Sequence, residues 1–150
     1  MTDNAIELAR RVAKGVGLDP ALVCAIVEQE SSWDSFAVRY EQGFFDCYVQ
    51  PSAAGGAVRP STSTEARCRA FSWGLMQIMG QCAREMGFDG PYLSELLEPA
   101  IGLQFGCKLL ARKLELAGGD VERALDLWNG GANPAYSSQV MARIEKYRNG

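Results

Sequence analysis

The sequence predicts a mainly α-helical single domain over residues 1–150, with one long irregular excursion between its second and third helices. Apolar residues recur at helical spacing over most of the chain. Residues that start helices and glycines that end them recur between these segments. From Tyr40 to Phe71 the helical period is lost and aromatic, Gly, Pro, Ser and Thr residues accumulate, so we expect a loop in which a short hairpin can form. A chain of 150 residues can bury one core.

The first two helices have clear boundaries. Thr2 or Asp3 is expected to cap a helix that runs to about Val16 and ends at Gly17. Asp19 followed by Pro20 is a strong start for the second helix, which continues to Glu30.

Glu30 is an acid on the apolar face of that second helix. At roughly 100° per residue it falls among the aliphatic residues, whereas Glu28 lies opposite and can stay in water. Burial disfavours the charged form of a carboxyl group and raises its pKa, so Glu30 is a candidate general acid. The alternative is that Glu30 marks a fraying helix end and turns into solvent, as most glutamates do. The aliphatic residues of the stripe are Leu22, Val23, Ile26 and Val27.

The second half of the chain predicts four more helices, with a short turn or helix between the first two. One runs from Trp73 to Met86 with Gln77 on its polar side, and a short turn or helix follows at Leu93–Leu97. Pro99 opens a long helix to Gly118 that we expect at the centre of the core. The last two are a helix capped by Asp120 and one started by Asn133-Pro134.

Composition excludes several kinds of chemistry. There are 15 basic and 18 acidic residues, a formal charge of −3, and no basic tract, so we expect no nucleic-acid partner. The chain has no histidine, which removes the commonest metal ligand and the usual triad base, and leaves acid–base work to carboxylates. Neither a phosphate-binding glycine loop nor a metal-ligand cluster is recognisable, so we expect no cofactor and no metal.

The cysteines and the N-terminus bear on the compartment. Five cysteines without a C-x-x-C pair are read mainly as reduced core residues, with a Cys47–Cys68 bridge as the alternative. The first 17 residues form an amphipathic segment rather than a signal peptide, and no run is long enough to cross a bilayer. We therefore expect a monomer made in the cytoplasm that does not insert into membranes.

Four sequence blocks, in this order, resemble the soluble lytic transglycosylase domain of the family 23 glycoside hydrolases, which has a lysozyme-like fold. The match runs roughly from Leu18 to Tyr147. The blocks are Ile26-Val27-Glu28-Gln29-Glu30-Ser31-Ser32-Trp33, Ser72-Trp73-Gly74-Leu75-Met76-Gln77-Ile78-Met79, Leu97-Glu98-Pro99, and Trp128-Asn129-Gly130-Gly131 with Tyr136.

The resemblance implies that Glu30 is the catalytic acid of an enzyme that cuts the MurNAc-β-1,4-GlcNAc bond of peptidoglycan. It further implies that several residues of the four blocks contact the glycan. By residue period, Met76 lies on the apolar face and is better explained by core packing, Gln77 points away from that face and is the better candidate, and core packing explains Trp128 nearly as well as sugar stacking does. These candidate substrate-binding residues are Ser31, Ser72, Met76, Gln77, Trp128, Asn129 and Tyr136.

The sequence also departs from the family pattern. Many relatives carry a serine nine residues after the acid, and that position is Arg39 here. The Asn that usually follows Asp-Pro is Gly102. The segment Arg39-Tyr40-Glu41 resembles a variant associated with phage and prophage enzymes.

Two mechanisms follow from the resemblance. A lytic transglycosylase needs one carboxyl group, because the C6 hydroxyl of the muramic acid attacks C1 and forms a 1,6-anhydro sugar. An inverting hydrolase needs a second carboxylate at about 6.5–9.5 Å to position water, and Glu41 and Glu65 are the candidates. We favour the transglycosylase.

A second alternative is an inactive glycan-binding or phage structural domain that keeps the fold and the cleft. A third is a helical interaction protein without a cleft. For an enzyme, we expect action on the cell wall or periplasm after release or delivery, in phage lysis or as part of a virion.

Overall fold

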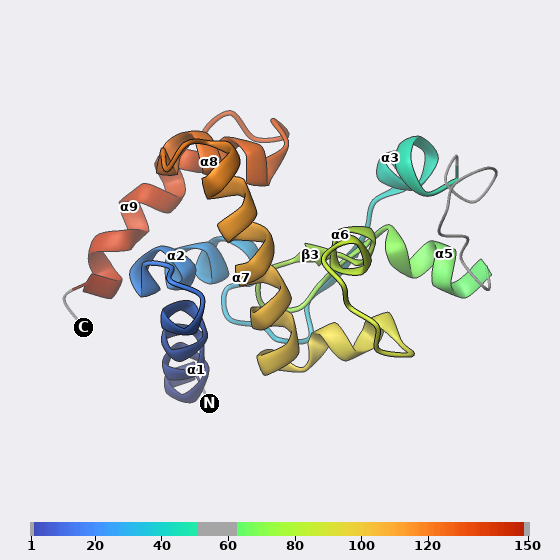
Figure 1. Ribbon diagram of the computed structural model, residues 1–150, viewed down its shortest axis with the longest axis horizontal. Coiled ribbons are helices and arrows are strands. Elements are labelled where there is room, and N and C mark those ends of the chain that lie inside the picture. Colours follow the sequence, from blue (N-terminus) through green and yellow to red (C-terminus); the bar gives the residue numbers. More distant parts are fainter. Residues whose placement is uncertain (1, 51–62, 149–150) are drawn as a thin grey trace.

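The computed structural model describes residues 2–50 and 63–148 (Figure 1). Its strands β1 (Val38–Tyr40), β2 (Phe71–Trp73) and β3 (Ile78–Met79) form one antiparallel sheet in the order β1-β2-β3. The helices are α1 (Thr2–Gly15), α2 (Pro20–Ser31), α3 (Gln42–Phe44), the π-helical turn η1 (Phe45–Val49), α5 (Ser63–Arg69), α6 (Gly80–Glu85), the 3₁₀ turn η2 (Leu93–Leu97), α7 (Pro99–Leu116), α8 (Val121–Asn129) and α9 (Tyr136–Arg148). The fold is therefore mainly α-helical with one small sheet, as predicted.

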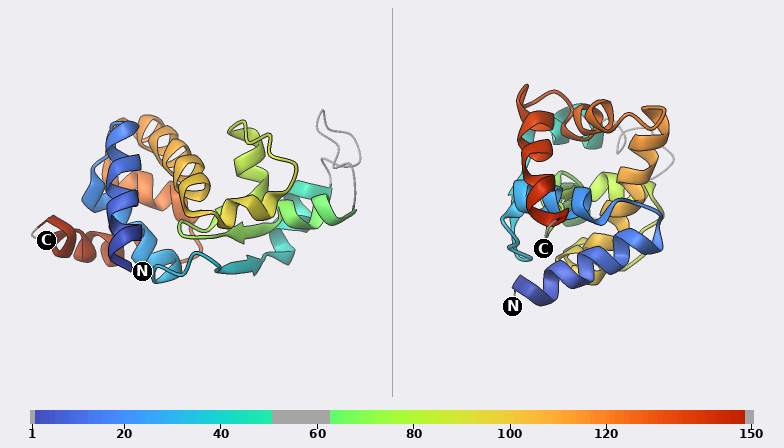
Figure 2. Two further views of the ribbon diagram at one scale, coloured as in Figure 1. Left: turned by 90° about the horizontal axis from the view of Figure 1, so that it is seen from below. Right: turned by 90° about the vertical axis from the view of Figure 1, so that its left-hand side faces the viewer.

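The elements form two groups with α7 between them. Helices α1, α2, α8 and α9 gather at one end, and the sheet lies at the other end with α3, α5 and α6 (Figures 1 and 2). One side of α7 carries Leu103 and Cys107 into the first hydrophobic cluster, and another carries Phe105 into the second. The long helix therefore joins two cores.

Helix α2 occupies the middle of the first group. The Asp19 side chain accepts a hydrogen bond from the Ala21 amide at 2.9 Å, and Pro20 takes the first helical position, as predicted. Every residue from Ala21 to Val27 is buried. The expectation that the 99–118 helix would be central to the core is confirmed, because α7 contributes to both clusters, although the segment Ala21–Val27 of α2 is the more completely buried.

The prediction of a helix from Trp73 to Met86 is wrong for the first half of that segment. Residues 71–79 form the β2–β3 hairpin, in which Ser72 pairs with Met79, and only Gly80–Glu85 is helical. Two residues in the connection, Gly74 (φ +66°) and Gln77 (φ +49°), adopt left-handed conformations that a right-handed helix cannot contain. The apolar spacing that mimicked a helix comes from residues of a tight turn that pack inward.

The excursion is more regular than predicted. The short elements α3 and η1 follow β1, and α5 precedes β2. The hairpin strands β1 and β2 flank the excursion rather than lie inside it, with Tyr40 opposite Phe71. The Gly- and Pro-rich stretch 51–62 lies outside the described residues.

The cysteines carry free thiols, so the structure does not contain the alternative Cys47–Cys68 bridge. Cys24 and Cys107 are buried in the first cluster, as core residues. Among the described helices, none combines the length and the hydropathy that a membrane span requires.

Candidate active site

Glu30 lies in the last turn of α2, at the edge of the buried core. Its Oε1 accepts a hydrogen bond from the Trp128 indole at 2.9 Å and one from the Tyr136 hydroxyl at 2.5 Å. Both donors come from the C-terminal part of the chain, about a hundred residues away in sequence. Oε2 has no hydrogen-bond partner among the described residues, and it is not shut off from solvent. One oxygen of the carboxyl group is therefore held and the other is available.

Burial raises the pKa of the Glu30 carboxyl above its usual value. The hydrogen bonds from Tyr136 and Trp128 and the charge of Arg39 act in the opposite direction but do not cancel it. Burial and the adjacent carboxyl group also raise the pKa of the Tyr136 phenol well above its usual range, so Tyr136 stays a donor. The site favours a protonated carboxylic acid whose orientation is fixed by its neighbours.

Glu30 opens into a cavity of about 550 Å³. A volume of this size suits a ligand of several rings. The lining residues come from the helices α2, α6, α7 and α8, from the sheet, and from α3 and η1. The lining includes Arg39, Glu41, Phe44, Tyr48, Ser72, Gln77, Met79, Cys82, Leu109, Lys113, Trp128 and Asn129.

Gln77 and Ser72 line the cavity but use their polar groups to hold its wall. The Gln77 amide nitrogen donates to the Ala37 carbonyl at 2.9 Å and to the Gly74 carbonyl at 3.0 Å. Its oxygen accepts a hydrogen bond from the Ser72 hydroxyl at 2.8 Å. Gln77 thus fixes the β2–β3 turn against the segment before β1, and its left-handed φ is stabilised by three hydrogen bonds.

Ser31 and Met76 lie behind the cavity rather than in it. The Ser31 hydroxyl donates to the Leu75 carbonyl at 2.8 Å, which ties the end of α2 to the hairpin. Met76 is fully buried, and its sulfur lies so close to Gly106 that a Cβ there would approach it to 2.5 Å. The prediction that Met76 contacts substrate is wrong, because its side chain fills the core between the hairpin and α7.

Trp128 and Asn129 bring the end of α8 to the cavity. The Trp128 indole donates a hydrogen bond to Glu30, and the side chain also packs against the first core cluster. Trp128 is therefore both a core residue and part of the site. The Asn129 amide donates to the Asn133 carbonyl at 3.1 Å and shapes the loop before α9.

Of the two candidates for a second carboxylate, only Glu41 reaches the cavity. It is the other carboxyl group among the described residues that line it, and it pairs with Arg39, which lies two residues earlier on β1. Arg39 stands where many relatives carry a serine, and its charge is the third influence that lowers the pKa of Glu30.

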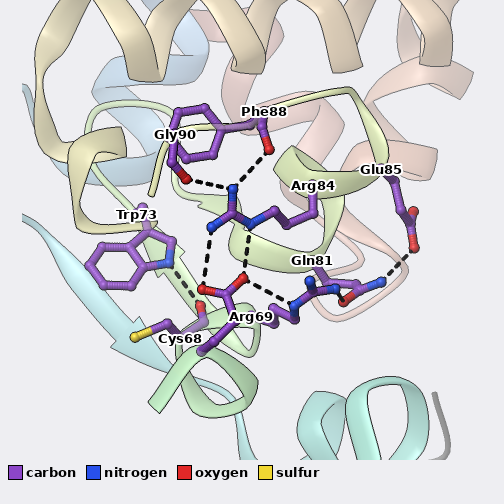
Figure 3. Close-up of polar contacts among 9 residues, drawn as sticks. Cys68, Arg69, Trp73, Gln81, Arg84, Glu85, Phe88 and Gly90 are labelled. Carbon is purple, nitrogen blue, oxygen red and sulfur yellow. Dashed lines mark hydrogen bonds and ion pairs between the residues drawn. The ribbon is translucent and has the colours of Figure 1, made fainter. Parts of the chain in front are cut away.

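Glu65 is part of a largely buried ion-pair network instead. Its carboxylate lies 2.9 Å from the Arg84 guanidinium and 3.2 Å from that of Arg69. Arg84 also donates to the carbonyls of Phe88 and Gly90, and Arg69 to Gln81 (Figure 3). Glu65, the other candidate for a second carboxylate, is not among the residues that line the cavity, and its carboxylate joins α5 to α6 instead.

Two lining residues on α7, Leu109 and Lys113, were not among the site residues predicted from the sequence. They are four residues apart and therefore share one face of the helix. A cation on the inward face of a helix is the same kind of signal that identified Glu30, and it could have been found in the same way.

A carboxylic acid with a raised pKa, at the end of a buried helix and facing an open cavity beside a small sheet, is the arrangement of lysozyme-like glycosidases. The model of the transglycosylase SLT domain family matches residues 7–148. The chain therefore belongs to the transglycosylase SLT domain family.

A solved structure shows the same fold. The protein is similar to a Burkholderia AP3 phage endolysin, with a TM-score of 0.63, 22% sequence identity, and coverage of 100% of this chain and 72% of the other. The likeness concerns the fold, and membership of the transglycosylase SLT domain family makes the protein a peptidoglycan lytic enzyme.

Proposed function

We propose that the protein is a lytic transglycosylase that cuts the MurNAc-β-1,4-GlcNAc bond with Glu30 as its single acid and base. The carrying observation is that Glu30, alone among the described carboxyl groups, combines burial, a raised pKa, an oxygen without a hydrogen bond and a place in the cavity lining. Glu41, the other carboxylate among the described lining residues, forms an ion pair with the Arg39 guanidinium. This distribution favours a mechanism that needs one carboxyl group.

In this mechanism Oε2 of Glu30 gives its proton to the bridging oxygen as the bond from that oxygen to C1 of the muramic acid breaks. The C6 hydroxyl of the same sugar then attacks C1, and its proton returns to the Glu30 carboxylate. The products are a free GlcNAc 4-hydroxyl and a 1,6-anhydro-MurNAc end. Hydrogen bonds from Trp128 and Tyr136 keep the carboxyl group in place and stabilise its charge while the proton is away.

The second candidate is an inverting hydrolase in which Glu41 activates water, and its position in the cavity is the observation that favours it. Mass spectrometry of digested peptidoglycan separates the two. Anhydro ends are one water lighter than the hydrolytic ends, and the proposal expects the anhydro ends. Glu41→Gln should then retain cleavage, whereas a hydrolase would lose it; hydrolytic ends would overturn the proposal.

An inactive glycan-binding domain is tested by the same digest. The proposal expects wild-type protein to reduce the turbidity of exposed cell walls and Glu30→Gln to bind them without lysis. Equal lysis by both proteins would overturn the role of Glu30, and lysis by neither would favour the binding domain.

We also propose that the enzyme reaches the wall from the cytoplasm during phage lysis or as part of a virion. The fold that it shares with a phage endolysin supports this proposal. Expression inside cells should leave them intact until the membrane is permeabilised, and lysis should then follow. Lysis without permeabilisation would contradict it.

A further inference from the structure

We propose that Lys113 binds a carboxylate of the peptide stem on the substrate, so that the enzyme prefers strands that carry stems over bare glycan. This inference rests on the proposed glycan cleavage and adds a specificity-determining residue to it.

Lys113 lies in the last turn of α7 and lines the same cavity as Glu30. In residues 2–50 and 63–148 its ammonium group has no hydrogen bond or ion pair. The titratable group that senses its charge is the Cys82 thiol on α6, whose pKa is raised by burial and by Glu85 while Lys113 acts to lower it. A part-buried cation therefore lines the cavity without an ion-pair partner among the described residues.

The other charges of the cavity are accounted for. Among the described lining residues the ionisable acids and bases besides Lys113 are Glu30, Arg39 and Glu41. Arg39 and Glu41 neutralise each other. The raised pKa of Glu30 favours its neutral form. Among the described lining residues, Lys113 is therefore the basic group without an ion-pair partner.

Its neighbours on α7 show that a lysine here need not face the cavity. The Lys108 ammonium lies over the Phe105 ring, 4.6 Å from its centroid, and the Arg112 guanidinium lies 3.9 Å from the Met86 sulfur. Neither lines the cavity. A cation in a last helical turn is favoured by the helix dipole, but that preference is satisfied equally on the solvent side.

The surroundings of Lys113 suit a carboxylate. Leu109, Met79 and Cys82 line the same region with carbon and sulfur atoms, and an ion pair is stronger where apolar groups displace water. In peptidoglycan the sugar rings are uncharged, and the lactyl carboxyl group of the muramic acid is tied up in an amide wherever a stem is attached. The free carboxylates of such a strand belong to the stem.

The test compares Lys113→Met with Arg112→Met, which removes the same charge one residue away and outside the cavity. Three substrates are used: strands with intact stems, strands whose stem carboxylates have been converted to amides, and strands stripped of stems, which carry a free lactyl carboxylate. For Lys113→Met we expect kcat/KM on intact stems to fall about three- to tenfold, mainly through KM, since a part-exposed ion pair contributes about 1 kcal/mol. The amidated and stripped strands should be cut as by wild type.

Lys113→Arg, which keeps the charge, should retain the preference, and Arg112→Met should match wild type on all three substrates. A loss of equal size on all substrates would overturn the inference and indicate a structural effect. A loss confined to stripped strands would overturn it as well, because the bound group would then be the lactyl carboxylate. If wild type cut none of the substrates, the proposed function itself would fail.

Discussion

At the scale of single residues, Glu30 and Glu28 show how position in one helix sets the behaviour of a carboxyl group. They lie two residues apart on α2 and point in different directions. Burial dominates at Glu30 and raises its pKa. At Glu28 burial also acts to raise the pKa, but hydrogen bonds from Tyr147 and Lys146 outweigh it and the pKa is lowered. Glu28 is thus less free in solvent than its place on the helix suggested.

Glu30→Gln should lower kcat by about 10²–10⁴-fold, the usual contribution of a general acid, and should raise thermal stability at pH 8. A group whose pKa is raised on folding stabilises the fold below its unfolded pKa and loses that contribution as the pH rises through the folded value. Glutamine cannot ionise and avoids the loss. Thermal melts at pH 4 and pH 8 should show the difference growing with pH.

Glu28→Gln is the matched control, and its effect on stability should have the opposite sign, because the pKa of Glu28 is lowered on folding. Its lowered pKa means that the stabilising contribution is present above the unfolded pKa and is lost as the pH falls through the folded value. The variant should be less stable than wild type at pH 8 and should approach it in acid. A gain in stability at pH 8 from both variants would contradict the assigned shifts.

Tyr136→Phe should move the alkaline limb of the pH–activity profile to higher pH. The Tyr136 hydroxyl is the strongest of the influences that lower the pKa of Glu30, so its removal leaves burial less opposed. A profile of kcat/KM between pH 4 and 9 checks this. An unchanged limb would mean that the limb reports another group.

At the scale of elements, the β2–β3 hairpin depends on a close approach between backbones. A Cβ at Gly74 would lie 2.7 Å from the Leu96 carbonyl oxygen of η2, in a residue with φ +66°. Gly118 has nearly the same φ, +65°, and open space around it. Comparing substitutions at Gly74 and Gly118 therefore separates the cost of backbone strain from the cost of steric crowding.

Gly118→Ala should destabilise the fold by about 1–2 kcal/mol through strain alone. Gly74→Ala should cost about 1–3 kcal/mol more, since the hairpin and η2 must move apart. Chemical denaturation of both variants measures the difference. Equal costs would show that the contact with η2 relaxes freely.

The ion-pair network around Glu65 holds the elements beyond the cavity. Glu65→Gln should cost about 3–5 kcal/mol of stability, because it leaves two buried guanidinium groups without their anion. Below its melting temperature the variant should keep the wild-type kcat, as expected of a structural carboxylate. A folded variant without activity would return Glu65 to the list of catalytic groups.

At the scale of the whole molecule, α7 couples two hydrophobic clusters. Leu103 is fully buried in the first, and Phe105 packs edge-on against Phe88 in the second, with ring centroids 5.2 Å apart. Glu30 lies on α2 of the first group, whereas Arg39, Ser72 and Met79, which line the same cavity, lie on the sheet of the second. The width of the cavity is therefore set by how the two groups pack on one helix.

Leu103→Ala should cost about 2–5 kcal/mol and Phe105→Ala about 3–5 kcal/mol. If α7 couples the clusters, calorimetry should show one unfolding transition that shifts to lower temperature in each variant. Two separate transitions, each sensitive to one variant, would show that the groups unfold independently.

The sequence determined the features that local chemistry controls. Asp19-Pro20 fixed the start of α2, Asp120 capped α8 with a hydrogen bond to the Arg123 amide, and the period of α2 placed Glu30 beside the core. These features depend on residues a few positions apart, so their spacing in the chain is their spacing in the structure.

Only the tertiary structure decided the rest. The turn at Gly74 and Gln77 is held by Ala37, some forty residues earlier, and Glu65 is bound by an arginine nineteen residues later. The two donors that hold Glu30 come from the other end of the chain. No periodicity encodes such contacts, because they depend on which faces meet when the helices pack.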